Sequence, residues 1–150
     1  MKVLLLLAYV FVATHAMDKE FAAKFVQEVQ ELGIKCAGEE KPDPDDIARM
    51  MAHKLPETHE GKCVIYCIYK HYNTVNGDGT INVDAGIKAL QPLKENDEAL
   101  YNLIVADFKK CAGSISINSD PCETSFNLVN CCLVEAKAKG LPKELFDFDI

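Results

Sequence analysis

The sequence lacks the features that several large classes of protein require. After residue 16 no stretch approaches 18 uninterrupted apolar residues, so the sequence predicts no stable membrane insertion. It contains no Gly-x-Ser-x-Gly elbow, no His-Glu-x-x-His helix and no C-x2-C pair, and no histidine follows His71. Basic residues are few, 16 against 23 acidic ones, which gives a formal net charge of −7. This charge disfavours nucleic acid and anionic membranes as partners.

The first sixteen residues, MKVLLLLAYVFVATHA, differ in character from the rest of the chain. One lysine precedes an apolar run from Val3 to Ala13, and a small residue, Ala16, ends the segment. This pattern predicts a secretory signal peptide, residues 1–16, that is too short to span a bilayer and is removed after Ala16. We therefore expect an exported chain, residues 17–150, that is about one domain long.

Seven cysteines lie in the part of the chain expected to remain after export. They are Cys36, Cys63, Cys67, Cys111, Cys122, Cys131 and Cys132. Export makes disulfides their default state, so six of them can form three bridges and the seventh must be free or intermolecular. Zinc is the competing use of clustered cysteines, but the chain has neither a C-x2-C pair nor an ordered pair of histidines. The sequence therefore predicts disulfides and no metal centre.

Apolar residues recur with helical spacing in almost every segment, and this predicts one compact all-α domain of six helices. The predicted ranges are 18–32, 43–55, 60–71, 83–90, 96–111 and 120–139. Two starts are marked strongly, because Asp43 and Asp120 each stand as a capping acid before a proline at the first helical position. The residues expected to end helices are Gly33, Pro56, Pro92, Gly113 and Gly140.

The segment TVNGDGTINVDA, residues 74–85, has the centre of a calcium-binding loop without its ends. With Gly79 at the central glycine, such a loop needs a carboxylate at position 1 and a glutamate at position 12, where this chain has Thr74 and Ala85. We interpret the segment as tight turns at its Asn-Gly and Asp-Gly pairs, followed by Asn82 as the cap of the next helix.

The spacing of the cysteines limits how they can pair. Cys63 and Cys67 are one helical turn apart, which separates their Cβ atoms by about 5–6 Å, wider than the roughly 3.8 Å of a disulfide. They must therefore reach two different partners. Cys122 and Cys131, nine residues apart, leave opposite sides of the last helix. The bridges must run between helices, and this geometry leaves the connectivity open.

The order C-x26-C-x3-C-x43-C-x10-C-x8-C, from Cys36 to Cys131, closely resembles the six-cysteine pattern of insect odorant-binding proteins of the pheromone-binding and general odorant-binding type. INVDAGIKAL, after the glycine turn, looks like the segment ahead of that family's fourth helix. The resemblance covers residues 17–150. It implies a six-helix, disulfide-bridged fold around an apolar cavity.

The resemblance also implies a disulfide pairing, Cys36–Cys67, Cys63–Cys122 and Cys111–Cys131, which agrees with the helix-face argument. Cys132 departs from the family pattern, and its position leaves two candidates for the partner of Cys111. The x8 spacing favours Cys131. We expect Cys132 to be a buried free thiol, with an intermolecular bridge as the alternative.

As a function, the resemblance implies a secreted carrier that holds a small hydrophobic odorant or pheromone and moves it through aqueous lymph to an odorant receptor. It implies no cofactor and a monomer or weak homodimer. The candidates for the ligand-binding wall are Met50, Met51, Leu55, Ile87, Leu90, Leu103, Ile104, Phe108, Phe126, Val129, Leu133, Phe146 and Phe148. Each fits an ordinary core equally well, because core stripes and cavity walls have the same periodicity. Candidate polar anchors are Tyr66, Tyr69, Tyr72, Tyr101 and Asn127.

The C-terminal tail, residues 140–150, alternates apolar Phe146, Phe148 and Ile150 with acidic residues. This period of two predicts an extended segment with one apolar side. The resemblance implies that the tail covers the cavity. We expect that protonation of its acids below about pH 5 to 6 would loosen it. Charging of His53, His59 or His71 would act in the same way, although a solvated surface position is the simpler interpretation of each histidine.

Two rival classes fit less well. Secreted phospholipases are helical and contain adjacent cysteines, as at Cys131 and Cys132, but their chemistry needs a histidine close behind that pair. Leu133, Val134 and Glu135 stand there instead, so we predict that the protein is not an enzyme. A saposin-like lipid-interacting module would have different cysteine spacing. A carrier in a secretion other than sensillar lymph remains an alternative that the sequence does not separate.

Overall fold

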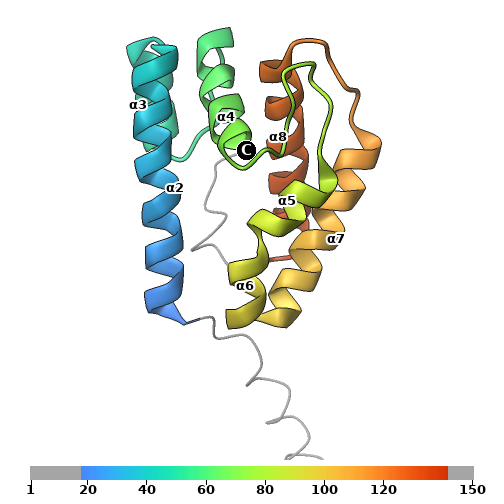
Figure 1. Cartoon of the computed structure of the whole chain (residues 1–150). Helices are drawn as coiled ribbons and strands as arrows, with labels where there is room; N and C mark the ends of the chain where they lie inside the picture. Colours follow the sequence, from blue (N-terminus) through green and yellow to red (C-terminus); the bar gives the residue numbers. More distant parts are fainter. Residues whose placement is uncertain (1–17, 142–150) are drawn as a thin grey trace, which may run out of the picture.

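The computed structural model describes residues 18–141, and in this range the chain is helical (Figure 1). The helices are α2 (Lys19–Glu40), α3 (Pro44–Met51), α4 (His59–His71), α5 (Val83–Ala89), α6 (Gln91–Asn96), α7 (Glu98–Ser114) and α8 (Pro121–Ala138). The described range contains no strand, only an isolated bridge between Val75 and Ile81. The all-α prediction is confirmed, with one helix more than expected. The predicted signal peptide and residues 142–150 of the tail lie outside the described residues.

The predicted helix starts are confirmed by their capping side chains. The Asp43 carboxylate accepts hydrogen bonds from the first-turn amides of α3, and Asp120 accepts one from the Cys122 amide at 2.9 Å. Asn82 accepts one from the Ala85 amide at 3.0 Å, as the turn interpretation of residues 74–85 expects. These acceptors satisfy amides that have no partner within their own helix.

Three expected helix ends are wrong. Gly33 lies inside α2, where a Cβ atom would approach the Ile68 side chain of α4 to 3.9 Å, so the helices pass closely there. The helix ends instead at Glu40, followed by Lys41, whose φ of 52° is left-handed, and by Pro42. Pro92 stands in the first turn of α6. Proline is tolerated there because the amide hydrogen that it lacks would have no partner within the helix. Gly113 is likewise inside α7.

Helix α4 lies between α2 and α8 and packs against both, and α7 packs against α8 and α6 (Figure 1). Three disulfides hold this arrangement: Cys36–Cys67 joins α2 to α4, Cys63–Cys122 joins α4 to α8, and Cys111–Cys131 joins α7 to α8. This is the pairing that the resemblance implies. Cys132 is the free cysteine of the described range, but it is half-buried and not fully buried as expected.

Buried side chains form two groups. Val75, Phe108, Cys111 and Leu128 make the first core cluster, between α4, α7 and α8. Leu93, Leu100 and Tyr101 make the second core cluster, where α6 meets α7. The clusters are connected through Ile87 of α5, which packs against both. Gly86 allows this approach, because a Cβ atom there would overlap the Phe108 ring.

Candidate functional site

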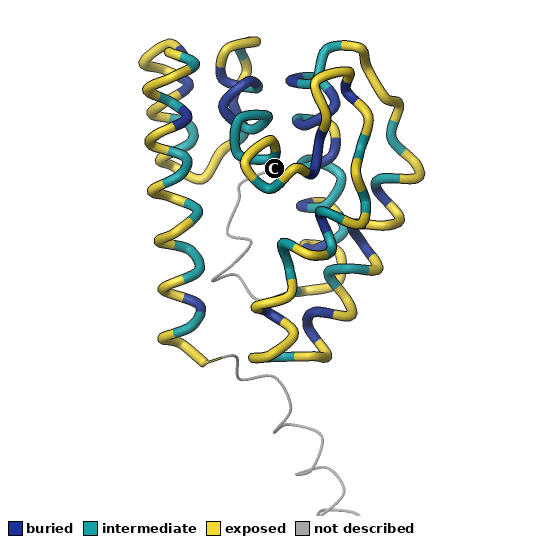
Figure 2. The backbone as a smooth tube through the Cα atoms, viewed as in Figure 1, coloured by how far each residue is buried: buried dark blue, intermediate teal, exposed yellow. Residues whose placement is uncertain are grey.

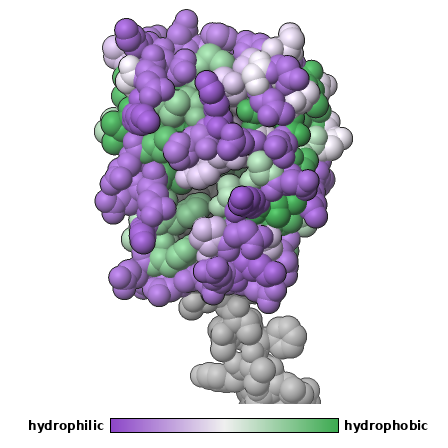
Figure 3. All heavy atoms as spheres, viewed as in Figure 1, coloured by the Kyte–Doolittle hydropathy of each residue, from purple (hydrophilic) through white to green (hydrophobic). Residues whose placement is uncertain are grey.

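A hollow opens on the face of the molecule shown in Figure 3. It lies between α2 and the α5–α6 segment, below the C-terminal end of α4. Hydrophobic side chains gather along its margins, and hydrophilic ones cover most of the surrounding surface (Figure 3). Such an apolar concavity in an acidic, polar surface is the form expected of a site for small apolar molecules.

Half-buried hydrophobic side chains on several helices surround the second core cluster. Phe21 of α2, Ile87 and Leu90 of α5, and Ile104 and Val105 of α7 pack against the second core cluster without being fully covered. Phe21 also stacks on Phe25, with ring centroids 6.2 Å apart. That this remaining surface contacts an apolar ligand is a prediction.

The C-terminal half of α4 contributes Tyr69, which packs with Cys132 of α8 against the first core cluster. Both side chains are half-buried. Burial raises the pKa of the Tyr69 hydroxyl, and the neighbouring Cys132 raises it further. Burial likewise raises the pKa of the Cys132 thiol to about 12, with smaller contributions from the Asp107 and Glu135 carboxylates. Protein surrounds both groups closely.

The structure brings together only part of the predicted wall. Ile87, Leu90, Ile104 and Phe108 lie together around the two core clusters. Leu133 is buried and Val129 is half-buried on α8. Phe126 is half-buried near the start of α8, with the Lys62 Nζ 4.9 Å from its ring centroid. Phe146 and Phe148 lie outside the described residues. That these side chains contact a ligand stays a prediction.

Two candidates do not face inward. The exposed fraction is 79% for Met51 and 41% for Leu103, so the expectation for both is wrong. Met51 is the last residue of α3, which ends earlier than predicted, and Leu103 lies on the outer side of α7. Met50 and Leu55 are half-buried on and just after α3, which stands beside the C-terminal end of α2 (Figure 1). The wall candidates omit Phe21, which heads the apolar stripe of the first predicted helix and packs against the second core cluster.

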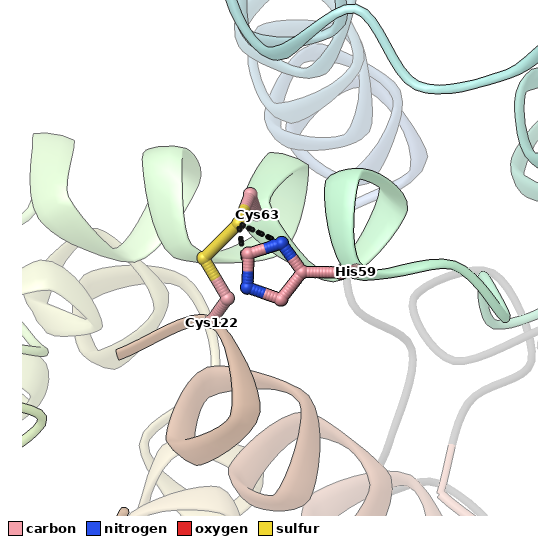
Figure 4. Close-up of side chains that lie close together, drawn as sticks. All are labelled: His59, Cys63 and Cys122. Atoms are coloured by element: carbon pink, nitrogen blue, oxygen red, sulfur yellow. Dashed lines mark hydrogen bonds between the residues drawn. A yellow bond between two sulfur atoms is a disulfide. The ribbon is translucent and has the colours of Figure 1, made fainter. Parts of the chain in front are cut away.

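Among the described residues, one group has the residue types of a metal site: His59, Cys63 and Cys122. Figure 4 shows the His59 ring lying against the bond that joins the two sulfur atoms. Because both cysteines are oxidised, neither offers the thiolate that a metal would need. The His59 Nε2 lies 2.8 Å from an Asp120 carboxylate oxygen. This group is therefore a structural contact between the first turns of α4 and α8.

In the calcium-like segment, residues 74–85, the Asp78 carboxylate forms hydrogen bonds within the segment itself. The Asp78 carboxylate accepts from the Thr80 amide at 3.0 Å and from the Thr80 hydroxyl at 2.6 Å, and these bonds lower its pKa. Gly79 has a φ of 81°, and a Cβ atom there would overlap the Asn118 carbonyl oxygen. The tight-turn interpretation is confirmed at Gly79.

Ion pairs connect α8 to α4 on one side and to α7 on the other. Lys62 of α4 lies 2.9 Å from Glu123, and Lys110 of α7 lies 2.6 Å from Glu135. Lys139 pairs with the buried carboxylate of Asp107.

Burial raises the pKa of Asp120, but hydrogen bonds from the Cys122 amide and His59 outweigh this, so the net pKa lies below the usual range.

Comparisons with known proteins agree with this geometry. The model of the PBP/GOBP family matches residues 18–135. General odorant-binding protein 19d of Drosophila melanogaster is 27% identical over 114 residues, covering 76% of this chain and 75% of the relative. General odorant-binding protein 28a of the same species is 26% identical over 124 residues, covering 83% of each.

Solved structures show the same fold. The structure of odorant-binding protein 28a from Drosophila melanogaster superposes with a TM-score of 0.63 at 24% identity, covering 81% of this chain and 99% of that one. Odorant-binding protein 5 of Apis mellifera gives a TM-score of 0.58 at 18% identity, covering 91% and 99%. Within the described residues, no helix has the length and apolar character needed to cross a membrane.

Proposed function

The chain belongs to the PBP/GOBP family, and from this premise we propose that it is a secreted carrier that holds a small hydrophobic odorant or pheromone in the hollow between α2, α4 and the α5–α7 segment. The observation that supports this most strongly is the hollow with hydrophobic margins in a mostly hydrophilic surface (Figure 3). Ile87 packs against both core clusters, and Phe21 of α2 packs against the second.

Binding in this proposal is a transfer of apolar surface out of water. Each Å² of apolar area that ligand and wall bury together contributes about 25 cal/mol, and the cost of immobilising the ligand reduces the total. The disulfides tie the helices that carry the wall before the ligand arrives, which lowers the ordering cost on binding. We expect micromolar affinity for volatile molecules.

Export and delivery complete the proposal. Residues 1–16 would direct secretion, and the carrier would work in sensillar lymph and release its ligand near an odorant receptor. The tail, residues 140–150, would close the hollow as a lid. A non-olfactory carrier would use the same hollow in another secretion, and tissue of expression distinguishes the two.

The test is displacement of a fluorescent apolar probe from the oxidised protein by a panel of aliphatic and aromatic volatiles. Saturable, competitive displacement at micromolar concentrations is the expected result. Failure of every probe to bind a protein whose mass shows three intact bridges would contradict the proposal.

A matched pair of variants locates the site. Ile87→Trp places a larger side chain between the two core clusters and should weaken probe binding about tenfold or more. Met51→Trp places the same ring at a position with an exposed fraction of 79% and should leave binding unchanged. Helical content and thermal stability of both variants confirm that they fold. Equal effects of the two changes would place the probe outside the hollow.

The lid is tested separately. Removing the residues after Leu141 should speed ligand dissociation, because the open hollow no longer retains the ligand. An unchanged dissociation rate would remove the lid from the proposal. Comparable affinity of the full chain at pH 7 and pH 5 would remove its pH-dependent release.

A further inference from the structure

We infer that Asn76 is a site of spontaneous covalent modification, at which the asparagine loses ammonia and becomes aspartate or isoaspartate. The backbone nitrogen of Gly77 bonds to the side-chain amide carbon of Asn76, the bond from that carbon to the side-chain nitrogen breaks, and the Gly77 proton leaves with this nitrogen as ammonia. Water then opens the cyclic imide at either carbonyl group. The reaction needs water and neither an enzyme nor an oxidant, and it does not involve the ligand hollow.

The first step is the exposure of the two reacting groups. The Gly79 amide donates to the Asn76 carbonyl oxygen at 3.0 Å, which closes a turn over residues 76–79. Asn76 and Gly77 are both exposed in this turn, so water reaches them. Among the described residues outside its own chain neighbours, a Cβ atom at Gly77 would approach only the Tyr66 hydroxyl, at 3.8 Å. The backbone at Gly77 therefore has room to move toward the Asn76 side chain.

The second step is a comparison with Asp78 and Gly79, the other acid- or amide-glycine pair of the same turn. Gly79 is buried, and a Cβ atom there would overlap the Asn118 carbonyl oxygen. The Asp78 carboxylate accepts two hydrogen bonds from Thr80, at 3.0 and 2.6 Å. Both partners of this pair are held in place, and an ionised carboxylate is a poorer target for a nitrogen nucleophile than an amide. Asn76 should therefore react first.

The remaining asparagines provide a comparison across the whole chain. Each is followed by a residue with a side chain, which hinders the approach of the next backbone nitrogen, whereas Asn76 is followed by glycine. Asn82 illustrates the difference, because Val83 follows it and its side chain accepts from the Ala85 amide at 3.0 Å. The asparagines of this comparison are Asn73, Asn82, Asn96, Asn102, Asn118, Asn127 and Asn130.

The third step is what restrains the reaction in the folded protein. The Asn76 side-chain nitrogen donates to the Thr80 hydroxyl at 2.9 Å, and the Asn76 amide donates to the Thr80 carbonyl oxygen at 2.8 Å. The side chain must leave the hydroxyl before its carbon can meet the Gly77 nitrogen. A local opening of the turn, and not unfolding of the domain, therefore sets the rate.

Both products disturb the turn. A carboxylate at position 76 cannot donate to the Thr80 hydroxyl, and it places a second negative charge near Asp78. Isoaspartate also adds one methylene group to the main chain, directly after Val75, which is 2% exposed and belongs to the first core cluster. The bridge between Val75 and Ile81 would then lose its register. The modification should therefore loosen the first core cluster.

The test incubates the full oxidised protein at pH 8 in water labelled with oxygen-18 and maps its peptides by mass spectrometry over several days. Conversion at Asn76 exchanges nitrogen for labelled oxygen, and chromatography separates the aspartate from the isoaspartate peptide. Gly77→Ala should slow conversion about tenfold or more, because the methyl group hinders the attacking nitrogen. Gly113→Ala is the matched control, since a Cβ atom at Gly113 would meet nothing within 4 Å among the described residues and no asparagine precedes it.

A third variant tests the restraint. Thr80→Val removes the hydroxyl that holds the Asn76 side chain and should speed conversion severalfold. Circular dichroism shows whether each variant folds. The thermal midpoint of the incubated wild-type protein should fall as the isoaspartate fraction rises, and an unchanged midpoint would contradict the effect on the first core cluster.

Three results would overturn the inference itself. Conversion of Asn82 or Asn118 as fast as that of Asn76 would remove the role of the turn. An equal rate in Gly77→Ala and wild type would exclude attack by the Gly77 nitrogen. No conversion in the folded protein, while the reduced and denatured chain converts, would mean that the native turn blocks the reaction. Probe binding by freshly prepared protein is measured separately, so the carrier proposal does not depend on any of these results.

Discussion

The two longest helices of the described range, α8 and α2, differ in how many side chains they bury. Over 18 residues α8 buries six side chains, whereas α2 buries only Ala22 and Cys36 over 22 residues. Figure 2 shows the contrast, with buried positions frequent along α8 and mostly half-buried or exposed ones along α2. Two disulfides attach α8 to its neighbours and one attaches α2, near its C-terminal end.

This difference explains how one small domain can be both stable and hollow. Helix α8 contributes Leu128 to the first core cluster and carries two of the three disulfides, while most of α2 is half-buried or exposed. Stability and ligand capacity therefore reside in different helices. Substitutions in α8 should lower the free energy of unfolding, and those in the α2 wall should act mainly on binding.

The largest expected effect is the loss of the bridge between α4 and α8. Replacing both Cys63 and Cys122 by Ala opens a link between residues 59 positions apart in the sequence. The unfolded chain gains entropy, so the free energy of unfolding should fall by about 4 kcal/mol. Urea denaturation followed by circular dichroism measures it. A loss below about 1 kcal/mol would mean that α8 is not held mainly from this side.

The next effect compares apolar side chains on the two helices. Leu128 is fully buried, and Leu128→Ala should cost about 3–4 kcal/mol by leaving a cavity. Phe21 of α2 is only half-buried, so Phe21→Ala should cost about 1–2 kcal/mol but weaken probe binding severalfold. Denaturation midpoints and probe affinities of Leu128→Ala and Phe21→Ala test both expectations. A larger stability loss from Phe21→Ala would reverse the assigned roles.

A smaller effect concerns the caps of the same helices. Asp120→Ala removes the cap of α8 and its contact with His59, and should cost about 1–2 kcal/mol at pH 7. Asp18→Ala removes the exposed cap of α2 and should cost about 0.5 kcal/mol.

The pH dependence of these variants follows from the lowered pKa of Asp120. Its contribution is present above the ordinary value of 3.8 and is lost as the pH falls below it toward the folded-state pKa. The difference between wild type and Asp120→Ala should therefore shrink below about pH 4. Denaturation at several pH values tests this, and a difference that grows on acidification would contradict the assigned sign.

The smallest effect on stability is expected from Cys132→Ala. The thiol is half-buried and forms no bridge, so its removal should change the free energy of unfolding by less than about 1 kcal/mol. Non-reducing electrophoresis should give the same monomer band for both proteins. A wild-type dimer that disappears in the variant would restore the intermolecular bridge as the correct interpretation of Cys132.

The cysteine spacing and the helical periodicity predicted most of the frame. Asp43, Asn82 and Asp120 identified helix starts, because a cap acts within a few residues and is visible locally. Gly33 and Pro92 were wrongly expected to end helices. Whether a glycine or proline ends a helix depends on a neighbouring helix or on its position within a turn. Gly33 lies where α2 passes α4, and Pro92 begins a helix instead of ending one.

The wall of the site was less predictable. Phe108 and Ile104 have the same periodicity as Leu103, yet Leu103 is turned outward, because a small rotation of α7 decides which edge of its stripe meets the neighbours. Tyr69 had no distinguishing signal among five candidate anchors. Its packing beside Cys132 against the first core cluster is evident only once α4 and α8 are placed together.

The most direct test of the central claim is backbone hydrogen exchange with and without a volatile molecule that displaces the fluorescent probe. The account predicts that the ligand slows exchange in the N-terminal half of α2, in α5 and in the first turns of α7, which border the hollow, and changes α3 little. Protection that is confined to α3, or that is absent everywhere while the volatile displaces the probe, would contradict a ligand site in the hollow.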